Sequence, residues 1–205
     1  MKYNKIIEEV TNSDISLMKE TWNEIDKDVF EHAVDTILKA KRIYIIGIRN
    51  SAPLADMLAM HLNLICENVI RIQTSGSREV FEQMMHINEK DVVIGISFPR
   101  YSLRTIKALE FANSRQAKII TLTDSVNSPL NLYSSCNLIA KSNLSPMMES
   151  MIAPVSVING LVMSLYIKKK KKVVDSLTEL EGIWDEYQIY DREELNSFAY
   201  NIESE

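Results

Sequence analysis

Two short segments carry hydroxyl groups and an arginine in a spacing that suits an anion. Residues 47–51 (GIRNS) and residues 97–102 (SFPRYS) each follow an apolar run and lead into a helical pattern. The free N–H groups and the dipole at a helix start favour negative charge, and hydroxyl and guanidinium groups add donors. The chemistry on offer is therefore the binding of a phosphate-like group. The candidate ligand-binding residues are Gly47, Arg49, Asn50, Ser51, Ser97, Arg100, Tyr101 and Ser102.

The same serines also have a purely structural interpretation. Ser51 is a plausible N-cap with Pro53 in the first turn, and Gly47 lets the backbone turn tightly before it. At Ser51 the spacing leaves a helix cap and an anion site equally open. The repetition of the pattern after a second strand favours the anion site.

Five apolar runs predict the strands that position these loops. Most are continuously apolar and rich in β-branched residues, which is typical of strands buried on both faces of a parallel sheet. The runs are residues 42–48, 69–73, 91–97, 118–123 and, more weakly, 136–141. Helical spacing over residues 53–66 and 102–115 separates them, so the pattern indicates βαβ units in an α/β domain. Ligands of such sheets bind beyond the carboxyl ends of the strands.

Helical patterns also flank the strands. About forty residues before the first strand carry an apolar face that includes Leu17, Trp22 and Phe30. Residues 146–187 read as one long helical region, the first half of which is apolar nearly all round. Such a helix must be buried, either in this domain or against a second copy of the chain.

Composition narrows the function classes. The 205 residues carry a formal net charge of −5, which does not suit a nucleic-acid-binding surface. Cys66 and Cys136 lie in apolar runs without metal or redox spacing, and neither GxxxxGK[ST] nor GxGxxG is present. We therefore expect no metal and no cofactor. The polar N-terminus is not a signal peptide, and no apolar run approaches the ~20 residues that span a bilayer, so we expect a cytoplasmic protein without a membrane partner.

The segments AKRIYIIGIRNSAPLA, DVVIGISFPRYS and AKIITLTDSVNSPL resemble the sugar isomerase (SIS) domain, in the form found as the effector domain of RpiR-family transcriptional regulators. The resemblance covers residues 15–170. It implies a three-layer αβα sandwich with a five-stranded parallel sheet, flavodoxin-like, behind N-terminal connector helices. The implied divisions are connector helices over 1–40, the SIS domain over 41–190 and a tail over 191–205.

In that family the loops after the first and third strands hold a sugar phosphate through hydroxyl groups. Carried over, these are Ser51, Ser97 and Ser102, and the implied partner is a phosphorylated sugar or a related anion. Many SIS domains have a small-residue loop after the third strand, whereas here Pro99 and Arg100 replace a serine and a glycine. Because Pro99 has no N–H, the ligand can differ from a simple hexose phosphate.

The resemblance also implies a homo-oligomer, a dimer or a tetramer. RpiR regulators bind DNA through an N-terminal helix-turn-helix domain, which has no counterpart in this sequence. We therefore expect either a separate fragment of a regulator or a stand-alone SIS protein. In either case DNA is bound only through a helix-turn-helix domain, not through this sequence.

Sensing and catalysis remain as alternatives, because an aldose–ketose isomerase needs a positioned base. Glu149 lies near where SIS enzymes place a catalytic glutamate, although a first-turn acid favoured by the helix dipole is the plainer interpretation. His61 is expected to pack on an apolar helix face, His86 to be exposed, and His32 belongs to the N-terminal helices. This thin set of bases favours a sensor of a phosphosugar over an isomerase that uses Glu149. A structural dimer with a degenerate site is a third interpretation.

Overall fold

The computed structural model describes residues 3–73, 76–145 and 148–189. The chain divides into two compact units, residues 1–165 and 166–205. The boundaries expected at residues 40 and 190 stay predictions, and the expected tail over 191–205 lies outside the described residues.

The centre of the first unit is a parallel sheet in the order β2-β1-β3-β4-β5. Its strands are β1 (Ile43–Gly47), β2 (Val69–Arg71), β3 (Val92–Ile96), β4 (Lys118–Thr123) and β5 (Cys136–Ile139). All residues of β1 and β3 are buried, since helices cover both faces. The five predicted strands and their parallel direction are confirmed.

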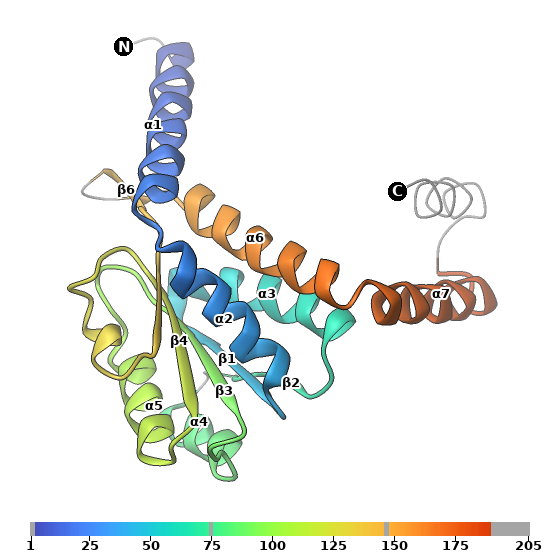
Figure 1. Cartoon of the computed structure of the whole chain (residues 1–205). Helices are drawn as coiled ribbons and strands as arrows, with labels where there is room; N and C mark the ends of the chain where they lie inside the picture. Colours follow the sequence, from blue (N-terminus) through green and yellow to red (C-terminus); the bar gives the residue numbers. More distant parts are fainter. Residues whose placement is uncertain (1–2, 74–75, 146–147, 190–205) are drawn as a thin grey trace. The chain divides into compact units, whose positions relative to one another are not determined.

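Helices make up most of the rest of the chain. They are α1 (Tyr3–Glu24), α2 (Lys27–Lys39), α3 (Ala52–Ile65), α4 (Ser77–Met84), α5 (Leu103–Ser114), α6 (Ile152–Lys168) and α7 (Lys170–Glu186), with short 3-10 turns η1 (Arg49–Ser51) and η2 (Pro129–Leu132). Helices α2 and α3 lie on one face of the sheet, and α4 and α5 lie on the other (Figure 1). This is the three-layer αβα arrangement that the sequence predicts.

Strand alternation divides the core between these faces. Tyr44 and Ile46 of β1 pack in a buried cluster with Val80 of α4 and Leu109 of α5. Both cysteines are buried, as predicted, and burial raises the pKa of the Cys136 thiol. Among the described residues no helix is long and apolar enough to cross a membrane.

The long helix predicted over residues 146–187 is wrong in two places. Two short antiparallel strands, β6 (Asn143–Ser145) and β7 (Met148–Glu149), come before the first helix. Pro146 and Met147, between these strands in the sequence, lie outside the described residues. Ser150 then fixes the start of α6, because its N–H bonds to the Ser142 carbonyl at 2.7 Å and its hydroxyl accepts the Ile152 N–H at 3.3 Å. A second interruption at Lys169 separates α6 from α7.

Candidate functional site

The two candidate loops leave the sheet side by side. Gly47, the last residue of β1, is in register with Ile96, the last residue of β3. From β1 the chain crosses to β2 on one side, and from β3 it crosses to β4 on the other. This is the point where the strand order reverses, and in open α/β sheets ligands bind in the crevice that such a reversal creates.

The loop after β1 is shaped by a close approach at Gly47. A Cβ at this position would overlap the carbonyl oxygen of Ser51 and would lie 3.0 Å from the Cβ of Ala55. The φ of Gly47 is not positive, so the glycine is needed for the close approach of the start of α3 and not for a left-handed backbone. The left-handed residue is Arg49, whose φ is 56°. Such strain in a non-glycine residue clusters at ligand sites.

Ser51 is buried but makes no capping hydrogen bond to α3. Its φ and ψ of −86° and −9° are helical, whereas a capping serine has an extended backbone. The interpretation of Ser51 as only a helix cap is therefore wrong. The exposed side chains of Arg49 and Asn50 lie in the same short turn.

The loop after β3 is held by its two serines. The buried Ser97 hydroxyl accepts the Ser102 N–H at 3.1 Å, and the Ser102 hydroxyl caps α5 by accepting the Thr105 N–H at 3.4 Å. A hydroxyl that accepts still has a hydrogen to donate, so both serines combine the structural role with a donor for an anion. Pro99 and Arg100 are exposed at the bend between them.

Tyr101 ties this loop to the segment that follows β4. Its hydroxyl donates to Oδ1 of Asp124 at 2.8 Å. Burial, and then the bond to Asp124, raise the pKa of Tyr101 to about 12, so its proton stays in place around neutral pH. Sequence spacing does not predict this contact, because 23 residues separate Tyr101 from Asp124. Tyr101 therefore anchors the loop, with its hydroxyl directed to Asp124.

Glu149 reaches the same edge of the sheet through the β6–β7 hairpin. Its Oε2 accepts the side-chain N–H of Asn50 at 3.4 Å, across 99 residues of sequence. The side chain is half-buried in β7, so its interpretation as a first-turn acid of a helix is wrong. A carboxylate thus lies next to the loop after β1.

The histidines bring no acid–base group to these loops. His61 is half-buried in α3, His32 is exposed in α2, and His86 is exposed beyond α4, as predicted for His86. Within residues 3–73, 76–145 and 148–189 no three His, Cys, Asp or Glu side chains gather as a metal site.

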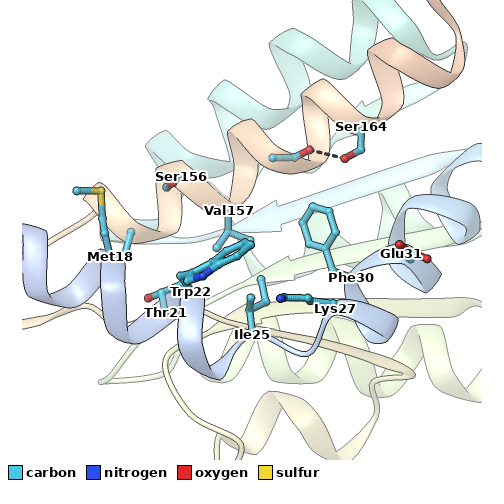
Figure 2. A pocket seen from close by; sticks show the side chains of 12 residues that line it. Met18, Thr21, Trp22, Ile25, Lys27, Phe30, Glu31, Ser156, Val157 and Ser164 are labelled. Atoms are coloured by element: carbon cyan, nitrogen blue, oxygen red, sulfur yellow. Dashed lines mark hydrogen bonds between the residues drawn. The ribbon is translucent and has the colours of Figure 1, made fainter.

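A separate concave surface lies between α1, α2 and α6 (Figure 2). The groove has a volume of about 430 Å³. Trp22 lies along it and is 65% exposed, although its helical spacing predicts a buried face; Lys27 Nζ sits 4.7 Å from its ring centre. Phe30 faces Gly160 of α6 across the groove. Its lining is mainly apolar and does not suit a phosphate.

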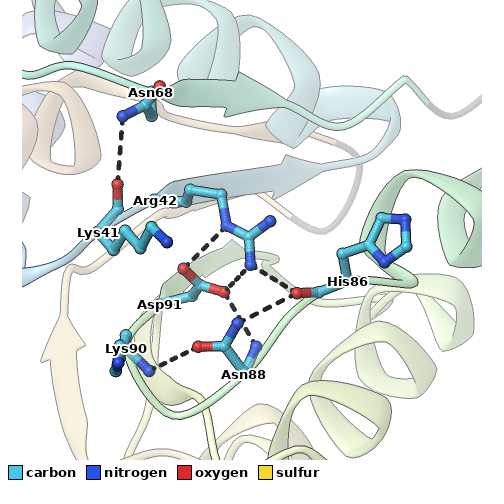
Figure 3. Close-up of polar contacts among 7 residues, drawn as sticks. All are labelled: Lys41, Arg42, Asn68, His86, Asn88, Lys90 and Asp91. Atoms are coloured by element: carbon cyan, nitrogen blue, oxygen red, sulfur yellow. Dashed lines mark hydrogen bonds and ion pairs between the residues drawn. The ribbon is translucent and has the colours of Figure 1, made fainter.

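A polar cluster occupies the opposite, amino-terminal edge of the sheet (Figure 3). Arg42, just before β1, binds both carboxylate oxygens of Asp91, just before β3, at 3.0 and 2.6 Å. Asp91 is fully buried and also accepts the Asn88 N–H at 2.9 Å, while Arg42 donates to the His86 carbonyl. The bonds to Asp91 raise the pKa of Arg42. This cluster joins two strands and lies away from the candidate loops.

Solved structures share this arrangement. The sugar isomerase domain of an RpiR transcription factor from Sphaerobacter thermophilus superimposes with a TM-score of 0.80 at 26% identity, covering 84% of this chain and 96% of that one. The Vibrio vulnificus NanR protein, solved with ManNAc-6P, has a TM-score of 0.77 at 21% identity and covers 89% of this chain and 69% of that one. At 21% identity the NanR likeness shows the fold alone.

Curated relatives are uncharacterised HTH-type transcriptional regulators. One from Haemophilus influenzae is 28% identical over 60% of this chain, and one from Clostridium perfringens is 29% identical over 62%. The chain spans less than half of their lengths, 42% and 44%. The resemblance to effector domains of RpiR-type regulators is thereby confirmed.

The SIS domain model matches residues 36–164, from the end of α2 through the whole sheet and into α6. The match includes both loops of the switch point and the β6–β7 hairpin that carries Glu149. On this match over more than half of its length, the chain belongs to the SIS domain family.

Proposed function

We propose that this chain is the phosphosugar-binding, sensing part of an RpiR-like transcriptional regulator of sugar metabolism. The phosphate lies between the loop after β1 and the loop after β3. Its donors are the Ser51, Ser97 and Ser102 hydroxyls with backbone N–H groups, and Arg49, Asn50 and Arg100 lie close by. Ligand binding biases the arrangement of DNA-binding domains that a longer regulator carries.

One observation carries this proposal. The two hydroxyl-bearing loops begin at residues that are in register on β1 and β3, at the reversal of strand order. Ser51 supports it further, because its buried hydroxyl is not used to cap α3. A buried hydroxyl at a helix start that is not spent on the helix is well suited to an anion.

The two serines of the loop after β3 should carry the response to a phosphosugar. A phosphosugar at 100 times its Kd stabilises the folded state by about 2.7 kcal/mol, which raises the melting temperature of a chain this long by about 5–10 °C. We expect this shift with ManNAc-6P or another hexose phosphate, and its loss in the Ser97→Ala, Ser102→Ala double variant. Thermal unfolding with each sugar phosphate and its unphosphorylated sugar is the measurement.

The control is Asp26→Ala. Asp26 caps α2 by accepting the N–H groups of Asp28 and Val29, so this variant loses a helix cap away from the candidate site. We expect it to lower the melting temperature by an amount comparable to the loss of the Ser102 cap and to keep the ligand shift. Absence of a shift with every phosphosugar in the wild-type chain would refute the assignment.

The contact between Asn50 and Glu149 favours a second candidate function, a stand-alone phosphosugar isomerase with Glu149 as the base. Incubation with aldose and ketose phosphates distinguishes the two. Turnover that Glu149→Gln abolishes, with binding kept, supports the isomerase. Binding without turnover in the wild-type chain supports the sensor.

We also propose that the chain forms a homodimer through the apolar groove. Of the 22 residues of α1 only Leu17 and Thr21 are buried, while Ile7, Ile15 and Trp22, which helical spacing places on one side of the helix, are exposed. The exposed apolar face of α1 in one copy can pack into the apolar groove of a second copy. Sedimentation should show a dimer that Trp22→Glu converts to a folded monomer; a monomeric wild-type chain contradicts it.

A further inference from the structure

A half-buried arginine at the end of β2 bonds to the backbone of the loop after β1. Arg71 is the last residue of β2, and its side chain is 15% exposed. One guanidinium nitrogen, Nη2, donates to the Gly47 carbonyl at 3.1 Å and to the Ala52 carbonyl at 3.4 Å. These two carbonyls bracket the residues between β1 and α3, including Arg49 and Ser51. Arg71 thus links both ends of the short turn that we assign to the anion.

The other nitrogens of Arg71 are engaged as well. Nε forms an ion pair with Oδ1 of Asp56 in α3 at 2.6 Å, and Nη1 donates to the Ile72 carbonyl at 2.5 Å. All three nitrogens therefore bond to the protein. A guanidinium used in this way has little left to offer a ligand, so its effect on an anion must pass through the loop.

The turn needs such a support. Arg49 has a left-handed φ of 56°, a strained conformation that persists only when surrounding contacts hold it. Gly47 lies so close to Ser51 that the turn has no room to relax toward the sheet. The Arg71 bonds to Gly47 and Ala52 link the two ends of this turn through one side chain.

We propose that Arg71 is a positioning residue of the anion site: it orients the Arg49–Ser51 turn without touching the ligand. The proposal rests on the proposed phosphosugar function and extends it. A lysine at this position keeps the positive charge but is a single donor point, which cannot span two carbonyls and Asp56 together. A residue that bound phosphate through charge would tolerate that change, whereas a residue that braces the turn would not.

The test compares Arg71→Lys with two controls in the full chain. Asp56→Asn removes the ion pair and leaves the carbonyl bonds, and Arg42→Lys weakens the arginine cluster at the opposite edge of the sheet. Calorimetry with ManNAc-6P and glucose 6-phosphate, well below each melting temperature, gives Kd. We expect Arg71→Lys to raise Kd about tenfold or more, as loss of a supporting contact commonly does, and both controls to stay within about twofold.

Hydrogen exchange supplies a readout that needs no ligand. In Arg71→Lys the amides of residues 48–52 should exchange faster relative to those of the loop after β3, whereas Arg42→Lys should leave that ratio unchanged even though it lowers global stability. Arg71→Gln is measured in parallel in case the lysine variant fails to fold.

Unchanged Kd and unchanged exchange in the Arg71 variants would overturn the positioning role while the phosphosugar proposal stands. A wild-type chain that binds no phosphosugar of the thermal-unfolding series would overturn the phosphosugar proposal, and exchange alone would then decide the role of Arg71. Equal loosening of both loops in Arg71→Lys would show a general structural role and would also overturn the inference.

Discussion

Replacing Arg42 with methionine should cost about 3–5 kcal/mol of unfolding free energy, because it leaves the Asp91 carboxylate buried without its cation. The side chain of Asp91 is 0% exposed, so water cannot replace the two hydrogen bonds that Arg42 supplies at 3.0 and 2.6 Å. The same change frees the His86 carbonyl from its guanidinium donor. For a chain of this length the melting temperature should fall by about 6–20 °C, measured by thermal or denaturant unfolding.

The matched control is Arg78→Met. Arg78 pairs with Glu82 at a similar distance, 2.7 Å, but both side chains are exposed on α4. Exposed pairs of this spacing contribute about 0.3–0.5 kcal/mol, so the control should unfold almost like the wild type. Equal effects of the two arginine substitutions would contradict the assignment of the Arg42 cost to burial of Asp91.

A double variant, Arg42→Met with Asp91→Leu, separates the cost of the orphaned charge from the value of the pair. Removal of both charges should recover much of the loss, since apolar replacements of a buried ion pair are often close to neutral. Recovery should stay incomplete, because the Asn88 N–H loses its carboxylate acceptor. The Arg42 cluster thus stabilises the amino-terminal edge of the sheet, whereas Arg71 acts at the carboxyl edge.

The strands were predictable because their signal is local. Continuous β-branched runs identify strands buried on both faces, and β1, β3 and β4 follow those runs within a residue or two. The same runs place the two serine loops after strands. Register then brings Gly47 and Ile96 together, although the strand order that makes this a switch point was implied only by the family resemblance.

Contacts across long separations could not be read from spacing. Arg71 reaches Gly47 and Ala52, 24 and 19 residues away, and no local pattern distinguishes it from a solvated arginine after a strand. Tyr101 looked like a ligand donor, but its hydroxyl bonds to Asp124. These contacts were missed because the partner residues lie on other βα units.

The strand pair β6–β7 shows a different limit. The sequence after β6 joins a helical apolar pattern without a glycine, so periodicity predicts a helix from residue 146 onward and includes the residues of β7. The structure ends that pattern through backbone bonding of Ser150 to Ser142 and through the bond of its hydroxyl to Asp14 of α1. Glu149 contacts Asn50 across 99 residues of sequence, so no local sequence pattern could predict this contact.

The close approach at Gly47 makes a single methyl group informative about the candidate site. In Gly47→Ala the new Cβ would overlap the Ser51 carbonyl, which belongs to the backbone and can be relieved only by moving the turn and the start of α3. Overpacking of this kind costs about 1–3 kcal/mol. Because the displaced residue is Ser51 itself, we expect the variant to fold with a lower melting temperature and to lose its response to phosphosugars.

Gly95→Ala on the neighbouring strand is the control for this prediction. Its Cβ would lie 2.9 and 3.0 Å from the two Cδ atoms of Leu109, which belong to a side chain and not to the backbone. We therefore expect a smaller loss of stability and an intact ligand response, both measured by thermal unfolding with and without ManNAc-6P.

If Gly47→Ala keeps its ligand shift while Gly95→Ala loses it, the anion does not depend on the loop after β1. If both variants keep the shift, the backbone at Ser51 is not part of the grip on the phosphate. Loss of the ligand shift in Gly47→Ala alone would place the phosphate against the Arg49–Ser51 turn, which lies between β1 and α3 and whose two ends bond to Arg71.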